Sequence, residues 1–196
     1  MDQPQRRQCR SRRPLIARYL LLAMLGAIAT CDSLDNVTLV VRDESVVPRR
    51  SVLEELLGSI SFAGLDNFDI SETQEFENQG YSKDQLDSVR LERFSLIITD
   101  PLGEPEDINF DFLSSIRFYV ETEGLPRLLI AELDPIPTEV QDIDLDVIPG
   151  VELQPYAIAP SMQITTSVNG MRPAQETTIL AEVTFDVDIA VSTACR

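Results

Sequence analysis

The chain has 196 residues, of which 43% are hydrophobic and 25% charged, a composition typical of a folded globular protein. It carries 33 acidic residues against 16 basic ones, and it contains neither histidine nor tryptophan. So acidic a protein repels the phosphates of nucleic acids, which are bound by clusters of lysine and arginine. The absence of imidazole removes the commonest metal ligand and every catalytic triad that depends on it. The composition therefore argues against a nucleic-acid partner and against most hydrolase mechanisms.

Residues 1–30 have the pattern of a secretory signal peptide. Six arginines precede an apolar run over residues 19–29, which is too short to span a bilayer. The run ends in Ala27-Ile28-Ala29, the small-x-small pattern that signal peptidase cleaves, and residues 11–16 also resemble a twin-arginine signal. We therefore expect export to the periplasm or cell envelope, with residues 31–196 as one domain. Without the six arginines and Asp2, 10 basic and 32 acidic residues remain, a formal charge of −22.

Cys31 follows the apolar run almost directly, and three fates are open to it. Ile28-Ala29-Thr30-Cys31 resembles a lipobox, whose cysteine is acylated and becomes the first mature residue, so that the protein contacts the membrane only through this lipid anchor. Alternatively, Cys31 forms a disulfide with Cys195, which export permits and which could contribute roughly 5 kcal/mol by closing so long a loop. In the third case both thiols stay free.

The rest of the chain predicts a mostly β protein, an antiparallel β-sandwich of the immunoglobulin-like or a similar kind. Strand-like runs bounded by turn residues recur at 37–41, 89–99, 116–121, 128–133, 140–148, 162–168 and 177–191. The apolar positions of these runs should form the core. We expect the following side chains to be largely buried: Leu91, Phe94, Leu96, Ile98, Phe118, Val120, Leu129, Leu145, Phe185, Val187 and Ile189.

Apolar and acidic residues alternate over residues 142–147 and 184–189, which places Ile143, Leu145 and Val147 on a buried face and the aspartates in water. In the strand at 89–99 the alternation changes phase near Leu96-Ile97-Ile98, which predicts a bulge or burial on both faces. Five prolines between 134 and 161 restrict any strands there to sheet edges or irregular segments. All seven glycines after the signal are expected between strands.

Helix signals are few, and they predict one or two short connectors. Ser51-Val52-Leu53-Glu54 has the capping-box pattern and would open a helix that ends at Gly58. Ser82-Lys83-Asp84-Gln85 would open a second helix that ends near Ser88.

The most concentrated acidic segment, residues 100–111, is a candidate calcium site. Its oxygen donors could converge on a hard cation, although turns after strands commonly collect the same residue types as a solvated loop. The candidate ligands are Asp100, Glu104, Asp107, Asn109 and Asp111. No other cofactor is expected.

Catalytic motifs are absent from the sequence, which contains no Gly-x-Ser-x-Gly elbow, no phosphate-binding glycine loop and no Ser-x-x-Lys motif. A pair of carboxylates could still act as acid and base, as in glycosidases, but no pair stands out from its surroundings. We therefore assign no catalytic residue and expect no deep catalytic pocket.

Several segments together resemble a family of uncharacterised bacterial lipoproteins of similar length: Val89-Arg90-Leu91, Thr99-Asp100-Pro101, residues 109–115, residues 118–121 and Gly124-Leu125-Pro126. These are packing and turn residues with no catalytic motif. The resemblance implies export and a β fold, and it implies no activity.

The combined expectation is an exported cell-envelope protein, a lipid-anchored and non-catalytic binding or structural module whose partner is another envelope protein or a surface ligand. Two alternatives remain open: a carboxylate-based extracytoplasmic hydrolase, and a calcium-stabilised surface or adhesion domain.

Overall fold

The computed structural model describes residues 36–51, 56–66, 68–70, 73, 76, 78, 80–103 and 108–190. Residues 34–196 belong to one compact unit. The signal segment, Cys31 and Cys195 lie outside the described residues, so the signal peptide, the lipid anchor and the disulfide stay predictions. No helix in the described part of the chain is long and apolar enough to cross a membrane.

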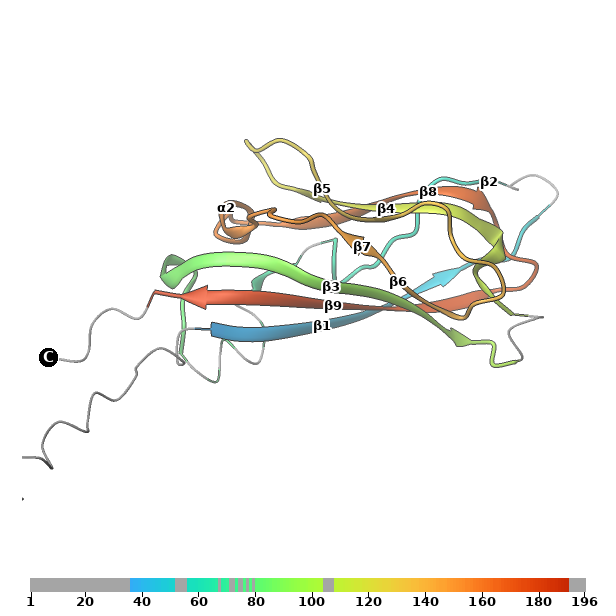
Figure 1. The fold of residues 1–196 in the computed structure, drawn as a ribbon, viewed down its shortest axis with the longest axis horizontal. Helices are drawn as coiled ribbons and strands as arrows, with labels where there is room; N and C mark the ends of the chain where they lie inside the picture. The colour runs from blue at the N-terminus through green and yellow to red at the C-terminus, as the bar shows by residue number, and fades with distance from the viewer. Residues whose placement is uncertain are drawn as a thin grey trace, which may run out of the picture. The chain divides into compact units, whose positions relative to one another are not determined.

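Two antiparallel sheets make up the structure, as predicted (Figure 1). The first sheet has the order β1 (Asn36–Val47), β9 (Thr177–Ile189), β3 (Leu86–Asp100) and β6 (Asp142–Asp144). The second has the order β2 (Leu56–Leu57), β8 (Gln163–Met171), β4 (Leu113–Glu121), β5 (Leu128–Leu133) and β7 (Asp146–Val147). The chain is therefore a mostly β protein with the layers of a β-sandwich.

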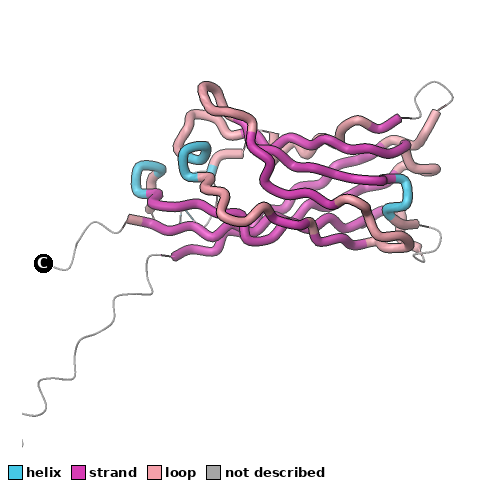
Figure 2. Tube along the Cα trace, turned by 45° about the horizontal axis from the view of Figure 1, so that its top comes forward, coloured by secondary structure: helices cyan, strands magenta, loops and turns pink. Residues whose placement is uncertain are grey.

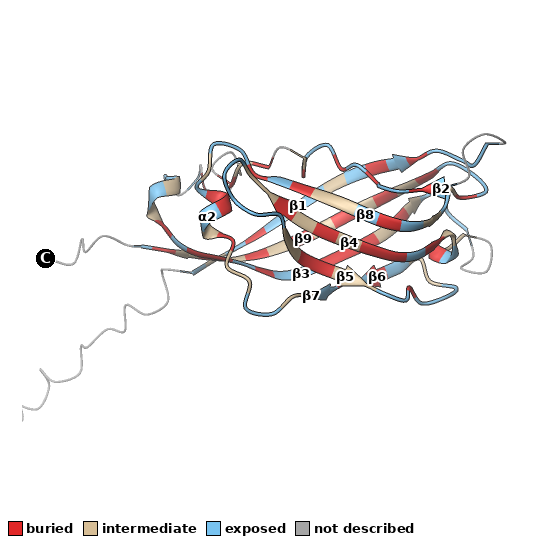
Figure 3. Ribbon diagram, turned by 90° about the horizontal axis from the view of Figure 1, so that it is seen from above, coloured by how far each residue is buried: buried red, intermediate tan, exposed pale blue. Residues whose placement is uncertain are grey.

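Strand β9 organises the first sheet. Its burial alternates with a period of two over its whole length, with the odd-numbered side chains buried, and apolar and polar residues follow the same alternation except at Thr177 and Leu180 (Figure 3). It pairs with β1 from Asn36–Asp188 to Val47–Thr177 without a register shift, and with β3 on its other side. This central position fixes which face of each neighbour enters the core.

The core lies between the sheets and is centred on Phe94 of β3 and Phe118 of β4. Both side chains are fully buried, and their ring centroids are 4.0 Å apart. Of the eleven side chains predicted to be buried, all but Leu129 are buried. Leu129 is half-buried because a register shift between Phe118 and Tyr119 accompanies a change of phase in β5, so that Ile130 and Ala131 fill the core instead.

The burial on both faces predicted near Leu96-Ile97-Ile98 in β3 is confirmed, and register shifts lie on either side of this segment. Leu91 and Phe94 are both buried, and the register against β9 shifts between Leu91 and Arg93. A second shift lies between Ile98 and Asp100, directly after the expected position. Near the expected position Ser95 is buried and Ile97 half-buried, so this part of β3 is covered on both faces.

The alternating pattern at 142–147 suggested a single strand, but the structure does not form one there. It forms two short pieces, β6 at the edge of the first sheet and β7 at the edge of the second, and the chain crosses between the sheets at Leu145. The backbone N–H of Leu145 donates to the carbonyl of Phe94, at 2.9 Å. The predicted alternation survives, because Ile143 and Leu145 are buried, Val147 is half-buried and the aspartates are exposed. The prediction of short edge strands in this proline-rich region is confirmed.

The predicted helix closing at Gly58 is wrong over the part of it that the structure describes. Leu56 and Leu57 form β2 and pair with Met171 and Gly170 of β8, because buried Leu57 gains more from packing than a short isolated helix gains from its cap. Residues 58–66 continue along β8 as an irregular edge, with the carbonyl of Leu65 accepting from Ile164 N.

Short helical turns connect the strands (Figure 2). Ser82 and Gln85 form the predicted capping box, but the helix is a single 3-10 turn, η3 (Lys83–Gln85), and β3 begins at Leu86. A second turn, η4 (Phe110–Phe112), precedes β4. The α-helix α2 (Gln154–Ala157) was not predicted, although Pro155 in its first turn is a helix-start signal.

One glycine departs from the expectation that glycines lie between strands. Gly170 is inside β8, where a Cβ atom would collide with the carbonyl oxygen of Phe112 and approach Cα of Leu113 to 2.9 Å. The sequence uses glycine here because the backbone of the β4 entry passes directly over this position.

Candidate functional site

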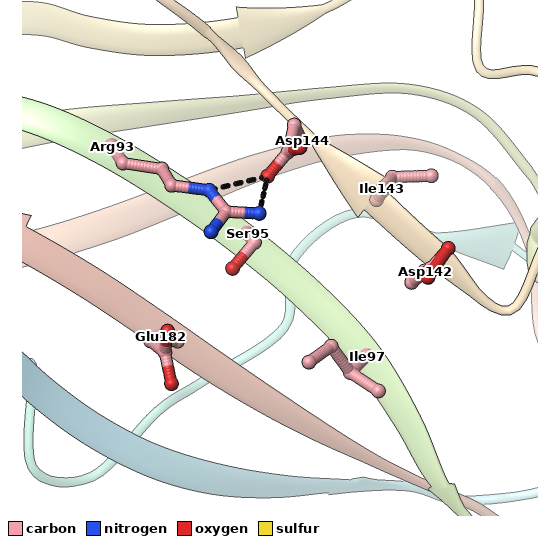
Figure 4. Close-up of a pocket in the computed structure, with 7 residues that line it drawn as sticks. All are labelled: Arg93, Ser95, Ile97, Asp142, Ile143, Asp144 and Glu182. Carbon is pink, nitrogen blue, oxygen red and sulfur yellow. Dashed lines mark hydrogen bonds and ion pairs between the residues drawn. The ribbon is translucent and has the colours of Figure 1, made fainter.

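A shallow pocket with a mostly polar lining lies on the outer face of the first sheet (Figure 4). Its volume is about 200 Å³. Three strands supply its lining: Arg93, Ser95 and Ile97 from β3, Asp142, Ile143 and Asp144 from β6, and Glu182 from β9. The register explains the gathering, because Ser95 is the direct neighbour of both Asp144 and Glu182.

Arginines neutralise two of the three carboxylates in this pocket. Arg93 directs Nε and Nη2 at one oxygen of Asp144, at 2.9 and 2.7 Å (Figure 4). Glu182 accepts from Nε of Arg42 on β1, at 2.6 Å. Asp142 makes no ion pair with any other described residue. The pocket therefore has one unpaired carboxylate beside two ion pairs that run across the strands.

This arrangement suits binding better than catalysis. A glycosidase-like pair needs one carboxyl that holds a proton and one that is ionised. In this pocket Asp144 and Glu182 are each hydrogen-bonded to a guanidinium, of Arg93 and Arg42 respectively. What the pocket offers is a small anionic surface with the hydroxyl of Ser95 at its floor.

Glu152 has the most specific environment of the acidic side chains that the structure describes. It accepts hydrogen bonds from the backbone of Val89 at 2.7 Å, from the backbone of Gln154 at 3.0 Å and from the hydroxyl of Ser88 at 2.8 Å. Partial burial opposes its ionisation, but these hydrogen bonds and the nearby charge of Arg90 outweigh it and hold the pKa of Glu152 below its ordinary value. Glu152 therefore acts as an ionised clamp between β3 and the start of α2, not as a proton donor.

The structure places three of the five candidate calcium ligands. Asp100 ends β3 and is exposed, Asn109 caps η4 by accepting from the backbone of Asp111 at 3.0 Å, and Asp111 accepts from the backbone of Glu139 at 2.9 Å. Glu104 and Asp107 lie outside the described residues. Within the described part of the chain no three acidic or cysteine side chains converge as metal ligands. The calcium site stays a prediction, and the oxygens of Asn109 and Asp111 have a structural use that the sequence did not indicate.

Gln141 binds two positions within this same acidic segment. Its side-chain amide donates to the carbonyl of Gly103 at 2.8 Å and to that of Ile108 at 2.9 Å. No local pattern indicated this contact, because the partners lie more than thirty residues away in the chain.

The outer face of the second sheet has a different character. The guanidinium of Arg127 lies over the ring of Tyr119, at 3.8 Å from its centroid, and Nε pairs with Glu121 at 2.9 Å. The hydroxyl of Thr165 donates to the same glutamate at 2.6 Å. Tyr119 and Glu121 occupy the outward phase of β4, which the alternation in the sequence could have identified.

No protein-family model, no curated protein and no solved structure matches this chain.

Proposed function

We propose that the chain is an exported cell-envelope protein, held to a membrane by a lipid on Cys31, whose β-sandwich serves as a non-catalytic binding or structural module. The observation that carries the proposal is the order of segments at the N-terminus: six arginines, a short apolar run, a cysteine directly after it, and then β1. The resemblance to bacterial lipoproteins in the packing and turn residues points the same way.

The short distance between Cys31 and β1 also supports an anchor. Only residues 32–35 separate the cysteine from Asn36, a connection that spans at most about 17 Å. An anchored sandwich would therefore stay close to the membrane surface, which suits a module that assembles with neighbouring envelope components.

The distribution of charge supports a non-catalytic role. Several carboxylates on each outer face form ion pairs across strands, as in Arg42–Glu182, Arg93–Asp144 and Arg117–Glu132. Such pairs set the register and solubility of a sheet. A binding or structural module needs no more chemistry than this surface.

Matched cysteine variants test the anchor. Cys31→Ala and Cys195→Ala are compared with the parent chain by membrane fractionation and by intact mass of the mature protein. The proposal expects a diacylglycerol-sized increment on a chain that begins at Cys31, release of Cys31→Ala from membranes, and no effect of Cys195→Ala.

The disulfide alternative gives a different pattern. The register places Asn36 opposite Asp188, so β1 begins beside the end of β9. If Cys31 and Cys195 are bridged, both variants lose the same covalent link, the parent mass is two hydrogen atoms short, and membrane attachment does not depend on Cys31. That pattern, or an unmodified chain that begins at Thr30, would overturn the proposed anchor.

A further inference from the structure

The sheet edges of this protein are unequal. The edge strands β6, β2 and β7 contain only two or three residues, which is one of the ways in which proteins prevent unwanted strand pairing. The remaining edge is β1, with 12 residues. Within the described part of the chain, no backbone hydrogen bond joins residues 36–47 to any segment other than β9. A long row of backbone donors and acceptors is therefore available along the edge of β1 that faces away from β9.

The two faces of β1 differ in how they are covered. On the inner face, the backbone N–H of Gly64 donates to Asp43 at 2.6 Å, so the segment after β2 closes the sandwich there. On the outer face, the side chains of Val40, Arg42, Glu44 and Val46 point to solvent, and the two valines are 38% and 56% exposed. Arg42 pairs with Glu182 through Nε alone, and Glu44 makes no ion pair with any other described residue.

These four side chains are complementary to themselves. When a second β1 lies antiparallel to the first with Asp43 opposite Asp43, Arg42 faces Glu44 of the other copy, and Val40 faces Val46. Each pair then occurs twice, because the arrangement has two-fold symmetry. We propose that β1 is a pairing edge, through which two copies of this chain join their first sheets into one continuous sheet.

Neighbouring registers lack this complementarity. Centring the pair on Arg42 would set the two arginines opposite each other, and centring it on Glu44 would set the two glutamates opposite each other. Like charges directly opposite on a sheet are destabilising, whereas opposite charges and pairs of β-branched residues are stabilising. The side chains on the outer face of β1 therefore favour this register. On the inner face it places Asp43 opposite Asp43, where each carboxylate also accepts a hydrogen bond from the backbone of Gly64 in its own chain.

Charge along the chain also favours this edge for a contact between two acidic molecules. Strand β1 contains Arg42 against Asp43 and Glu44, a net charge of −1, and Arg49 and Arg50 follow shortly after it, whereas residues 31–196 together carry −22. The pairing edge is thus a region of low mutual repulsion. This pairing does not depend on the lipid anchor. Antiparallel pairing places the two N-termini at opposite ends of the paired strands. Two copies anchored in one membrane would therefore lie with these strands along the plane of the membrane.

Charge reversal provides the test. The full chain is purified as the cell processes it, and its dimer dissociation constant is measured by sedimentation velocity. Glu44→Arg and Arg42→Glu each place like charges opposite one another, and each should raise the dissociation constant of the homodimer by about tenfold or more. An equimolar mixture of the two variants should restore association to the parent's level. In the mixed dimer, the two positive side chains at positions 42 and 44 of one variant face the two negative side chains at positions 44 and 42 of the other.

Glu123→Arg makes the same charge change in an exposed turn and should leave the dissociation constant unchanged. As a second measurement, a mixture of V40C and V46C variants should form an intermolecular disulfide between these two positions under mild oxidation, and V40C alone should not cross-link at this position. A parent chain that is monomeric at all concentrations would overturn the proposal. So would single variants that associate like the parent, or a mixture that does not recover.

Discussion

Removing the contact between Phe94 and Phe118 is the most direct test of how packing between the two sheets stabilises the fold. The rings belong to β3 and β4, on opposite sheets, and neither side chain has any exposed surface. Replacing Phe118 by alanine removes a buried aromatic ring from a site that the surrounding strands cannot close, which costs about 3–5 kcal/mol of unfolding free energy. For a domain of this size each kcal/mol corresponds to about 2–4 °C in Tm. The variant should therefore melt about 6–20 °C below the parent.

Thermal and urea unfolding followed by circular dichroism measure this change. Leu102→Ala serves as the control, since Leu102 is 86% exposed and its truncation should change the unfolding free energy by less than about 0.5 kcal/mol. A double-mutant cycle with Phe94→Ala should give a coupling energy of about 0.5–1.5 kcal/mol between the two rings. A loss below about 1 kcal/mol for Phe118→Ala, or additive single effects, would refute the claim that this pair centres the core.

Three further predictions concern single sites. The pKa of Glu152 is lower in the fold than its ordinary value of 4.5, so its stabilisation is fully present above that pH and is lost as the pH falls through the folded pKa. Because water screens its partly exposed carboxylate, Glu152→Gln should destabilise the protein by only about 0.5–1 kcal/mol at pH 7. The loss should shrink progressively below pH 4.5 in urea titrations at a series of pH values, and a loss that stays the same at every pH would contradict this. Gly170→Ala should lower the unfolding free energy by about 1–3 kcal/mol, because the backbone of residues 112 and 113 lies directly over this position in β8. Gly58→Ala is the control: its added Cβ atom meets no atom within 4 Å, so the change should be neutral or slightly stabilising. Equal melting points of the two variants would contradict this prediction. If residues 100–111 bind calcium, calcium should raise Tm and a chelator should reverse the rise, and an unchanged midpoint would exclude the site.

Much of the strand content could be predicted because the alternation along single strands carries it. From Ala181 to Ile189 apolar and polar residues alternate without exception, and the buried side chains Phe185, Val187 and Ile189 were identified from this pattern alone. Where a bulge interrupts a strand, the alternation no longer predicts burial. Leu129 is apolar like a core residue, but the register shift in the β4–β5 pairing turns it partly outward. The position of a bulge depends on the partner strand, which a single sequence does not name.

The polar contacts were less predictable than the core. Glu152 is bound by Ser88 and Val89, and Gln141 by Gly103 and Ile108, so each contact joins residues far apart in the chain. Nothing in the local sequence distinguishes Glu152 from the other acidic side chains. The same holds for residues 142–147, whose regular alternation hides a crossing from one sheet to the other, because both halves bury the same face.

The position of β9 bears on how the chain folds. Among the described strands, β1 has β9 as its only partner in the sheet, and Asn36 and Asp188 are separated by 152 positions in the chain. The first sheet thus cannot close until β9 has been synthesised, and its long-range pairing makes folding slow compared with that of proteins built from local contacts. During synthesis β1 remains without its strand partner until β9 has been made, so a chaperone or a translocation channel has a long interval in which to bind it.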